Sequence, residues 1–299
     1  MEMREELKKR TSEVEAVVES YLPKEEGHQK TIFEAMNYSV KAGGKRLRPL
    51  FMQEICRLFT GEVQPVVVPF MAAIEMIHTS SLVHDDLPCM DDDMMRRGQA
   101  STWAEYGEDM GVLAGDALMI YAFEVAAKAF KEVSDADDLK RVGRAIEILA
   151  SKTGIYGMIG GQTVDVELAG GPIPKNKLDF IYRLKTGALI EASMLIGAVL
   201  GGAAEEDCKI VESLAGKVGL AFQIQDDILD VTGDQEVLGK EAGSDEKNQK
   251  TTYVTLEGLE KAKKDVEALS VQAIEDLNKL PGNNEFLENL IRILIKRQK

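Results

Sequence analysis

Two aspartate-rich segments, far apart in the chain, carry the residues that could do chemistry: Asp85, Asp86 and Asp91 in the first, and Asp226, Asp227 and Asp230 in the second. Each follows an apolar run with helical spacing. On a helix, Asp226 and Asp230 share a face, and like charges at that spacing are destabilising unless cations compensate them. We therefore interpret the second segment as a cation-binding face rather than as a solvated acidic surface.

The first segment has a different spacing. Asp85 and Asp91 would point in different directions on a regular helix, because six residues turn it by roughly 240°. Pro88 lies between them and disfavours helical geometry, so we expect the backbone to turn there and bring both carboxylates to one site. Oxygen ligands without a histidine or cysteine pair at metal spacing favour Mg²⁺ over zinc. We expect His84 to form a hydrogen bond or to pack rather than to bind a metal.

Basic residues accompany both acidic segments: Lys45, Arg46, Arg48, Arg96, Arg97, Lys185, Lys240 and Lys250. The first three follow a pair of glycines and precede Pro49, which suits the first turn of a helix. Such a turn offers side chains and free amides to an anion. Arg96 and Arg97 directly follow the first acidic segment and could hold phosphate oxygens on ions bound there. The combination predicts metal-bridged diphosphate chemistry.

Composition and charge exclude several classes of protein. The formal net charge of −15 argues against a general nucleic-acid or anionic-membrane binder, because both need a basic face. Most of the first ten residues are charged, and they do not resemble a secretory signal. The apolar stretch 192–204 is too short to span a bilayer. We expect a cytoplasmic protein without a transmembrane segment and without a nucleic-acid partner.

The distribution of prolines predicts an all-α fold. Residues 89–171 and 175–280 contain no proline, and apolar residues recur within them at helical spacing. Several segments, notably 104–130 and 180–204, are apolar around most of the helix, as is typical of helices enclosed by other helices. No stretch resembles an interdomain linker, so we predict a single bundle-like domain over residues 1–299.

Taken in order, these residues resemble the trans-prenyl diphosphate synthases, and more narrowly the bacterial and plant enzymes that make farnesyl or geranylgeranyl diphosphate. The resemblance covers about residues 30–255 and rests on Gly44-Lys45-Arg46-Leu47-Arg48-Pro49, His78, the two acidic motifs, Arg96-Arg97, Lys185-Thr186, Gln223, Lys240 and Lys250. It implies roughly ten or more helices around a central cavity, usually in a homodimer. It also implies that the two acidic motifs face each other and hold three Mg²⁺ ions on the diphosphate of an allylic substrate, which is dimethylallyl, geranyl or farnesyl diphosphate.

The resemblance also implies a role for each residue. The metal ligands would be Asp85 and Asp91 for two ions and Asp226 for the third, with Asp86 and Asp230 in support. The allylic diphosphate would be held by Arg96, Lys185 and Lys250, and its side of the site would be lined by Thr186, Gln223 and Lys240. Isopentenyl diphosphate would be bound by Lys45, Arg48, His78 and Arg97. The catalytic set would be Asp85, Asp91, Arg96, Lys185, Asp226 and Lys240.

Product length should depend on the helix that precedes the first acidic motif. In the resembling family, an aromatic residue at the position of Ser80 goes with farnesyl products, so Ser80 and Ser81 leave room for a longer chain, with Ile77 as the next floor. The sequence therefore leans towards geranylgeranyl diphosphate. Tyr121 or Phe123 on another helix could limit the depth of the product pocket. Farnesyl diphosphate therefore remains an alternative product.

Two other functions share part of this pattern. A class I terpene cyclase would share the fold and the first motif, but its second metal site usually mixes Asn, Ser or Thr with Glu. A non-catalytic subunit of a heteromeric synthase would be expected to lose acidic residues, and both motifs are intact here. The chain departs from the family pattern at Ala100, Trp103 and Val254. The resemblance therefore does not extend to the loop after Arg97.

Overall fold

The structure is a computed structural model, and it describes residues 2–232 and 251–295. Within these ranges the regular secondary structure is helical apart from one short hairpin of β1 (Met95–Arg96) and β2 (Gln99–Ala100), which confirms the predicted all-α class. By its internal contacts the chain forms two compact units, residues 1–147 with 199–202, and residues 148–198 with 203–299. The single domain predicted from the sequence stays a prediction.

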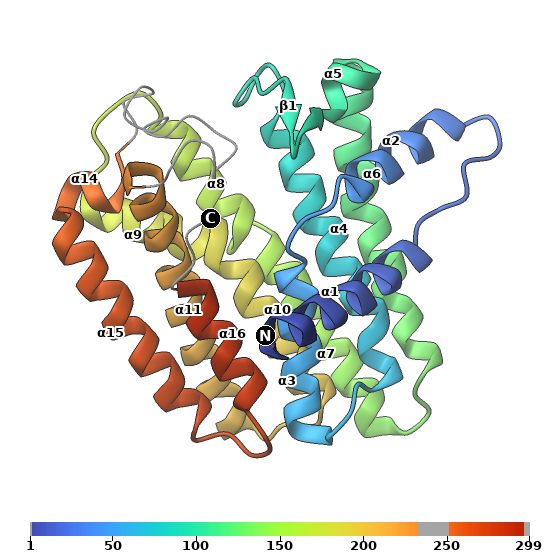
Figure 1. Ribbon diagram of the computed structural model, residues 1–299. Helices are drawn as coiled ribbons and strands as arrows, with labels where there is room; N and C mark the ends of the chain where they lie inside the picture. The colour runs from blue at the N-terminus through green and yellow to red at the C-terminus, as the bar shows by residue number, and fades with distance from the viewer. Residues whose placement is uncertain (1, 233–250, 296–299) are drawn as a thin grey trace. The chain divides into compact units, whose positions relative to one another are not determined.

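The first unit is built around one buried helix, α4 (Val68–Asp85), which follows the short helix η1 (Pro65–Val67). Helix α4 contacts α1 (Glu2–Ser20), α2 (Lys30–Lys41), α3 (Leu47–Thr60) and α6 (Glu108–Ala127) (Figure 1). Its apolar side chains are buried on all sides, as expected for a helix enclosed by others. The rest of the unit comprises α5 (Thr102–Tyr106), η2 (Lys128–Lys131) and most of α7 (Ala136–Thr153).

The second unit is built on the 28-residue helix α11 (Glu205–Thr232), which runs beside α15 (Leu259–Leu277) (Figure 1). Its other elements are α8 (Met158–Glu167), α9 (Lys175–Ile181), the π-helical turn η3 (Tyr182–Gly187), most of α10 (Ala188–Leu200), α14 (Tyr253–Glu257) and α16 (Glu285–Ile295). A core cluster that includes Tyr182, Ile228 and Tyr253 joins α9, η3, α11 and α14.

Two helical segments of the first unit are long and apolar enough to cross a membrane by length and composition. Residues Pro65–Asp85 are 72% buried within the protein, as the core position of α4 requires, and Glu108–Lys131 are 39% buried. Core helices of soluble proteins have the same length and composition, so this finding does not establish a membrane span.

Candidate functional site

The first acidic motif begins where α4 ends and the chain turns back on itself. The Asp91 amide donates to the Asp85 carbonyl over 2.9 Å, and the Asp93 amide donates to the Asp86 carbonyl over 3.1 Å. The turn predicted from Pro88 is therefore present, and it places Asp91 beside the end of α4. Asp85 is half-buried and Asp91 is exposed, so both carboxylates can receive a ligand from solvent.

Asp86 has a different environment from its neighbour. It is 2% exposed, and the Arg96 guanidinium on β1 binds it through Nε, at 2.9 and 3.1 Å from the two carboxylate oxygens, and through Nη2. Arg96 also lies 3.3 Å from Asp93. Burial raises the pKa of Asp86, and Arg96 opposes that rise by favouring the charged carboxylate. The predicted roles of Asp86 at a metal and Arg96 at a diphosphate stay predictions, since here the two side chains bind each other.

His84 and Trp103 both have backbone partners. His84 Nε2 lies 3.2 Å from the Val112 carbonyl on α6, in keeping with the expected hydrogen-bonding role. The Trp103 indole donates to the Asp93 carbonyl over 3.0 Å and thereby ties α5 to the loop after the first motif. Trp103, one of the departures from the family pattern, thus makes a hydrogen bond to this loop.

Arg97 lies against the glycine turn that precedes α3. It donates through Nη1 to the Gly43 carbonyl, and its guanidinium covers Gly44, where a Cβ atom would lie only 2.8 to 2.9 Å from it. Gly44 also has a φ of 140°, a conformation that other residues rarely adopt. Glycine at this position therefore lets Arg97 approach the turn that carries Lys45 and Arg48.

The basic residues around this turn act electrostatically on His78. The pKa of His78, which is half-buried on α4, is lowered well below its ordinary value by burial and by Arg48, Arg97 and Arg46. Burial also lowers the pKa of Arg48 to about 10, and its buried Nε has no hydrogen-bond partner. A neutral histidine beside a buried guanidinium nitrogen without a partner is an environment that an anion would stabilise. The first unit thus brings Arg48 and Arg97 close enough to His78 to act on it, and the binding of isopentenyl diphosphate by Lys45, Arg48, His78 and Arg97 stays a prediction.

The second acidic motif lies near the end of α11. Asp226 is exposed, Asp230 one turn later is half-buried, and Asp227 is 4% exposed. Asp227 accepts hydrogen bonds from the Tyr182 hydroxyl and, over 2.8 Å, from the Tyr253 amide. No separate role was predicted for Asp227, although its position next to Asp226 turns it by about 100° towards the core face of the helix.

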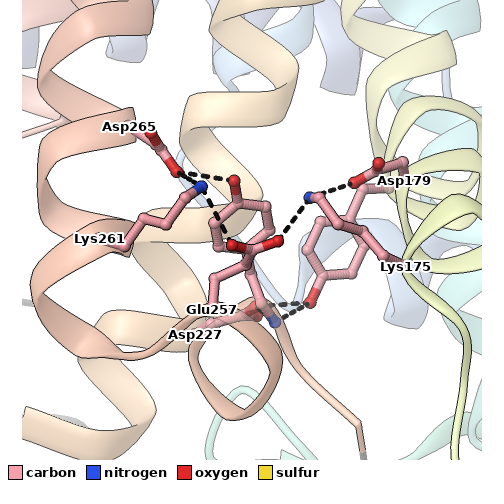
Figure 2. A network of polar contacts seen from close by, with 8 residues as sticks. Lys175, Asp179, Asp227, Glu257, Lys261 and Asp265 are labelled. Carbon is pink, nitrogen blue, oxygen red and sulfur yellow. Dashed lines mark hydrogen bonds and ion pairs between the residues drawn. The ribbon is translucent and has the colours of Figure 1, made fainter.

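Figure 2 shows that Asp227 belongs to a wider polar network at the start of α14. The Tyr253 hydroxyl donates to Asp265 over 2.8 Å, and Lys261 binds Asp265 over 2.8 Å and Glu257 over 3.1 Å. Lys175 stacks on the Tyr253 ring, with its Nζ 4.5 Å from the ring centroid. This network fixes the first turn of α14 against α9, η3 and α11.

Lys185 and Thr186 lie in the π-helical turn η3, a form that is frequent at functional sites. Lys185 forms an ion pair with Asp165 over 2.6 Å, and Thr186 donates to Gln223 over 2.8 Å. A Cβ atom on Gly161 would collide with the Lys185 amide, so this glycine serves close packing of α8 on the turn. Beside these contacts lies a cavity of about 70 Å³, lined by Asp165, Lys185, Thr186, Gln223, Asp227 and Thr252 among others.

The two serines expected to set product length lie in the last turns of α4. Ser80 is fully buried and its hydroxyl donates to the Ile77 carbonyl over 2.8 Å, while Ser81 donates to the His78 carbonyl over 2.9 Å. Both hydroxyls are therefore satisfied by their own helix. Tyr121 donates to the Tyr21 carbonyl at the end of α1 over 3.0 Å.

Not every predicted residue can be placed. Lys240 and Lys250 lie outside the described residues. Among residues 2–232 and 251–295, no three His, Cys, Asp or Glu side chains are grouped so that they could hold a metal ion. Asp85 and Asp91 belong to the first unit and Asp226 to the second, and the prediction that the two motifs face each other stays a prediction.

Known proteins resemble this chain along most of its length. The family model described as "Polyprenyl synthetase" matches residues 29–289. The chain is 45% identical over 247 residues to a chloroplastic geranylgeranyl pyrophosphate synthase of Catharanthus roseus, which covers 82% of this chain and 68% of that protein. It is 42% identical over 255 residues to a farnesyl diphosphate synthase of Geobacillus stearothermophilus, and this match covers 84% of this chain and 82% of that protein.

Solved structures agree with these relatives. An FPP/GFPP synthase from Zymomonas mobilis superposes with a TM-score of 0.85 at 32% identity and covers 98% of this chain and 99% of its own. A geranyltransferase from Helicobacter pylori, complexed with magnesium and isoprenyl diphosphate, superposes with a TM-score of 0.81 at 31% identity, with coverage of 97% and 95%.

Proposed function

The chain belongs to the polyprenyl synthetase family, and from that premise we propose that it is a short-chain prenyl diphosphate synthase. It would condense isopentenyl diphosphate with an allylic diphosphate, releasing pyrophosphate and lengthening the chain by five carbons. The observation that carries this proposal is the neutral His78 beside Arg48 and Arg97, where the buried Arg48 Nε has no partner. A diphosphate would supply an oxygen acceptor for this donor.

We propose that Asp85 and Asp91 bind two Mg²⁺ ions and Asp226 a third, with Asp86 and Asp230 in support. Carboxylate oxygens accessible to solvent are the donors that Mg²⁺ prefers, and the turn after α4 already places two of them close together in sequence and space. When bound, the ions would stabilise the charge that develops on the departing diphosphate.

The side chains of the protein have separate tasks in this reaction. Lys45, Arg48 and Arg97 would hold isopentenyl diphosphate, and His78, being uncharged, would donate a hydrogen bond to it. Lys185 and Arg96 would hold the allylic diphosphate, together with Lys240 and Lys250. Because the allylic carbon becomes cationic as its bond to oxygen breaks, apolar walls must exclude water. Helix α4 offers such a wall, since Ile74 and Ile77 are fully buried.

We propose that the product is geranylgeranyl diphosphate. At Ser80 the side chain is small, and its hydroxyl binds its own helix instead of projecting a polar group. Neither Ser80 nor Ser81 would block a growing chain in the way that an aromatic ring would. The name of the Catharanthus roseus relative favours the same product, and that of the Geobacillus stearothermophilus relative favours farnesyl diphosphate.

We further propose that the protein is a cytoplasmic homodimer of single-domain subunits. Support for one domain comes from the family model, which spans residues of both compact units. Support for the dimer comes from α6, on which Val112, Leu113 and Ile120 are 40, 49 and 71% exposed. These apolar side chains, which surround the exposed Asp116, would be stabilised if a second copy covered them. The cytoplasmic location rests on the sequence alone.

The test is to incubate the protein with isopentenyl diphosphate and each of dimethylallyl, geranyl and farnesyl diphosphate, with and without Mg²⁺, and to size the products by chromatography. We expect a twenty-carbon diphosphate that forms only with Mg²⁺. A sole fifteen-carbon product would contradict the proposed product length. A hydrocarbon product would indicate a cyclase, and no turnover with any pair would contradict the synthase itself.

A further inference from the structure

Arg46 stands between two predicted substrate-binding residues and yet has a different environment. Its side chain is fully buried. The Nε and Nη2 atoms bind the two carboxylate oxygens of Glu15 at 2.5 and 2.7 Å, and Nη1 binds Glu75 at 2.7 Å. Nη2 also donates to the Val40 carbonyl over 2.6 Å. One guanidinium thus connects α1, the last turns of α2, the start of α3 and the middle of α4.

These contacts leave Arg46 little capacity to bind a substrate. Four of its interactions are made by a group that has five N–H donors. Two carboxylates, Glu15 and Glu75, neutralise its charge, whereas the Nε of Arg48 has no partner. Arg46 and Arg48 are therefore not equivalent, although they are two residues apart in the same basic run.

The backbone of Arg46 is also unusual. It caps the start of α3 with φ of 48° and ψ of 34°, the left-handed conformation that few residues other than glycine adopt. Such a conformation persists only where the surroundings hold it in place. The contacts of the buried guanidinium do so here, and they thereby determine where the preceding residue, Lys45, and the first turn of α3, with Arg48, are directed.

We propose that Arg46 is a positioning residue for isopentenyl diphosphate: through Glu15 and Glu75 it holds the left-handed turn that directs Lys45 and Arg48 towards the substrate, without touching the substrate itself. This inference rests on the proposed function, in which Lys45 and Arg48 bind isopentenyl diphosphate. It adds that the affinity for isopentenyl diphosphate depends on carboxylates of α1 and α4 that lie outside the binding residues.

The experiment compares Arg46→Lys, Arg46→Met and Glu15→Gln with the wild type. The dissociation constant for isopentenyl diphosphate is measured by calorimetry without an allylic substrate, so that no reaction occurs. KM for both substrates and the urea midpoint of unfolding are measured alongside. A hydrogen bond to a charged group contributes on the order of tenfold to a hundredfold in affinity, so loss of the aligned Lys45 or Arg48 contact should weaken binding of isopentenyl diphosphate by roughly that factor. KM for the allylic substrate should change much less.

Arg46→Lys should not rescue binding, because a lysine ammonium cannot span both oxygens of Glu15, Glu75 and a carbonyl at once. Glu15→Gln keeps the proposal falsifiable if an Arg46 variant does not fold, since the Glu15 side chain is 29% exposed and its loss is tolerable. A matched control is Arg10→Met, which removes an ion pair between α1 and Glu54 of α3 without touching the turn. It should lower stability but leave the affinity for isopentenyl diphosphate unchanged.

Two results would overturn the proposal. One is wild-type affinity for isopentenyl diphosphate in folded Arg46→Met or Glu15→Gln protein. The other is a parallel loss for both substrates that tracks the unfolded fraction, as a purely structural role would give. If the wild-type protein binds no isopentenyl diphosphate and forms no product, the proposed function fails together with this inference. Synthase activity with unchanged affinity in the variants overturns the inference alone.

Discussion

Arg48 offers a direct test of the idea that the basic cluster is built for a substrate rather than for folding. Its buried Nε has no partner, and burial lowers the pKa of this guanidinium to about 10. A group whose pKa is lowered by burial destabilises the folded protein while it stays charged. The change we consider is Arg48→Met, which retains much of the side-chain volume and removes the charge.

The structure gives the size of the expected effects. The pKa falls from 12.5 to about 10, and each unit corresponds to 1.36 kcal/mol, so the charged group costs the free protein roughly 3 kcal/mol. We therefore expect Arg48→Met to leave the free energy of unfolding unchanged or to raise it, by at most about 3 kcal/mol. Binding should move in the opposite direction. A hydrogen bond to a charged group contributes about 1.5–3 kcal/mol, so affinity for isopentenyl diphosphate should fall by roughly tenfold to a hundredfold.

The assay pairs urea unfolding of the free protein with calorimetric titration of isopentenyl diphosphate. Arg292→Met serves as the control, because Arg292 is 50% exposed and pairs with Glu288 on the surface of α16. This control should change neither quantity appreciably, since exposed ion pairs contribute little. The reasoning is refuted if Arg48→Met lowers the free energy of unfolding by more than about 1 kcal/mol, or if it binds isopentenyl diphosphate as tightly as the wild type.

Three further predictions concern product length and stability. Ser80→Phe should shorten the main product to fifteen carbons, and an unchanged product on chromatography would show that this position does not set the floor. Asp227→Asn should lower the free energy of unfolding by about 1–3 kcal/mol, because the buried carboxylate accepts from Tyr182 and from the Tyr253 amide; a wild-type urea midpoint would contradict this. Burial would raise the pKa of Asp276, but hydrogen bonds, first from Lys217, lower it overall to about 2. Because its folded pKa is depressed, its contribution of roughly 2 kcal/mol is present above pH 4 and is lost as the pH falls towards 2, so Asp276→Asn should remove that part of the acid dependence of unfolding.

Much of the fold was predictable from the sequence because the pattern that specifies a helix lies within the helix itself. Long stretches without proline and apolar residues at helical spacing predicted the all-α class. Of the two segments expected to be enclosed, α10 in 180–204 is buried on all sides, whereas α6 in 104–130 exposes Val112, Leu113 and Ile120. Pro88 predicted the turn after α4, since its effect on the backbone is local. The β1–β2 hairpin was missed, because two-residue strands are too short to produce an alternating pattern.

Pairing between distant residues was not predictable in the same way. The sequence placed Arg46 in a basic run, and nothing near it indicates that Glu15 and Glu75 would bury it. Likewise, the sequence did not indicate that the hairpin would bring Asp86 and Arg96 to each other, and their predicted roles at a metal and a diphosphate stay predictions. Local patterns report residue type and helix face, and the partner of a buried charge depends on tertiary packing.

The two acidic motifs share an arrangement that follows from charge repulsion. In each pair of adjacent aspartates, the first stays accessible while the second is buried with donors of its own: Asp86 with Arg96, and Asp227 with Tyr182 and Tyr253. Two neighbouring carboxylates facing one site would repel each other, and one of them would tend to be protonated. Donors that occupy the second carboxylate relieve this repulsion, while the first carboxylate stays accessible to solvent. A change at Asp86 should therefore disturb the hairpin through Arg96, and a change at Asp227 should disturb the start of α14.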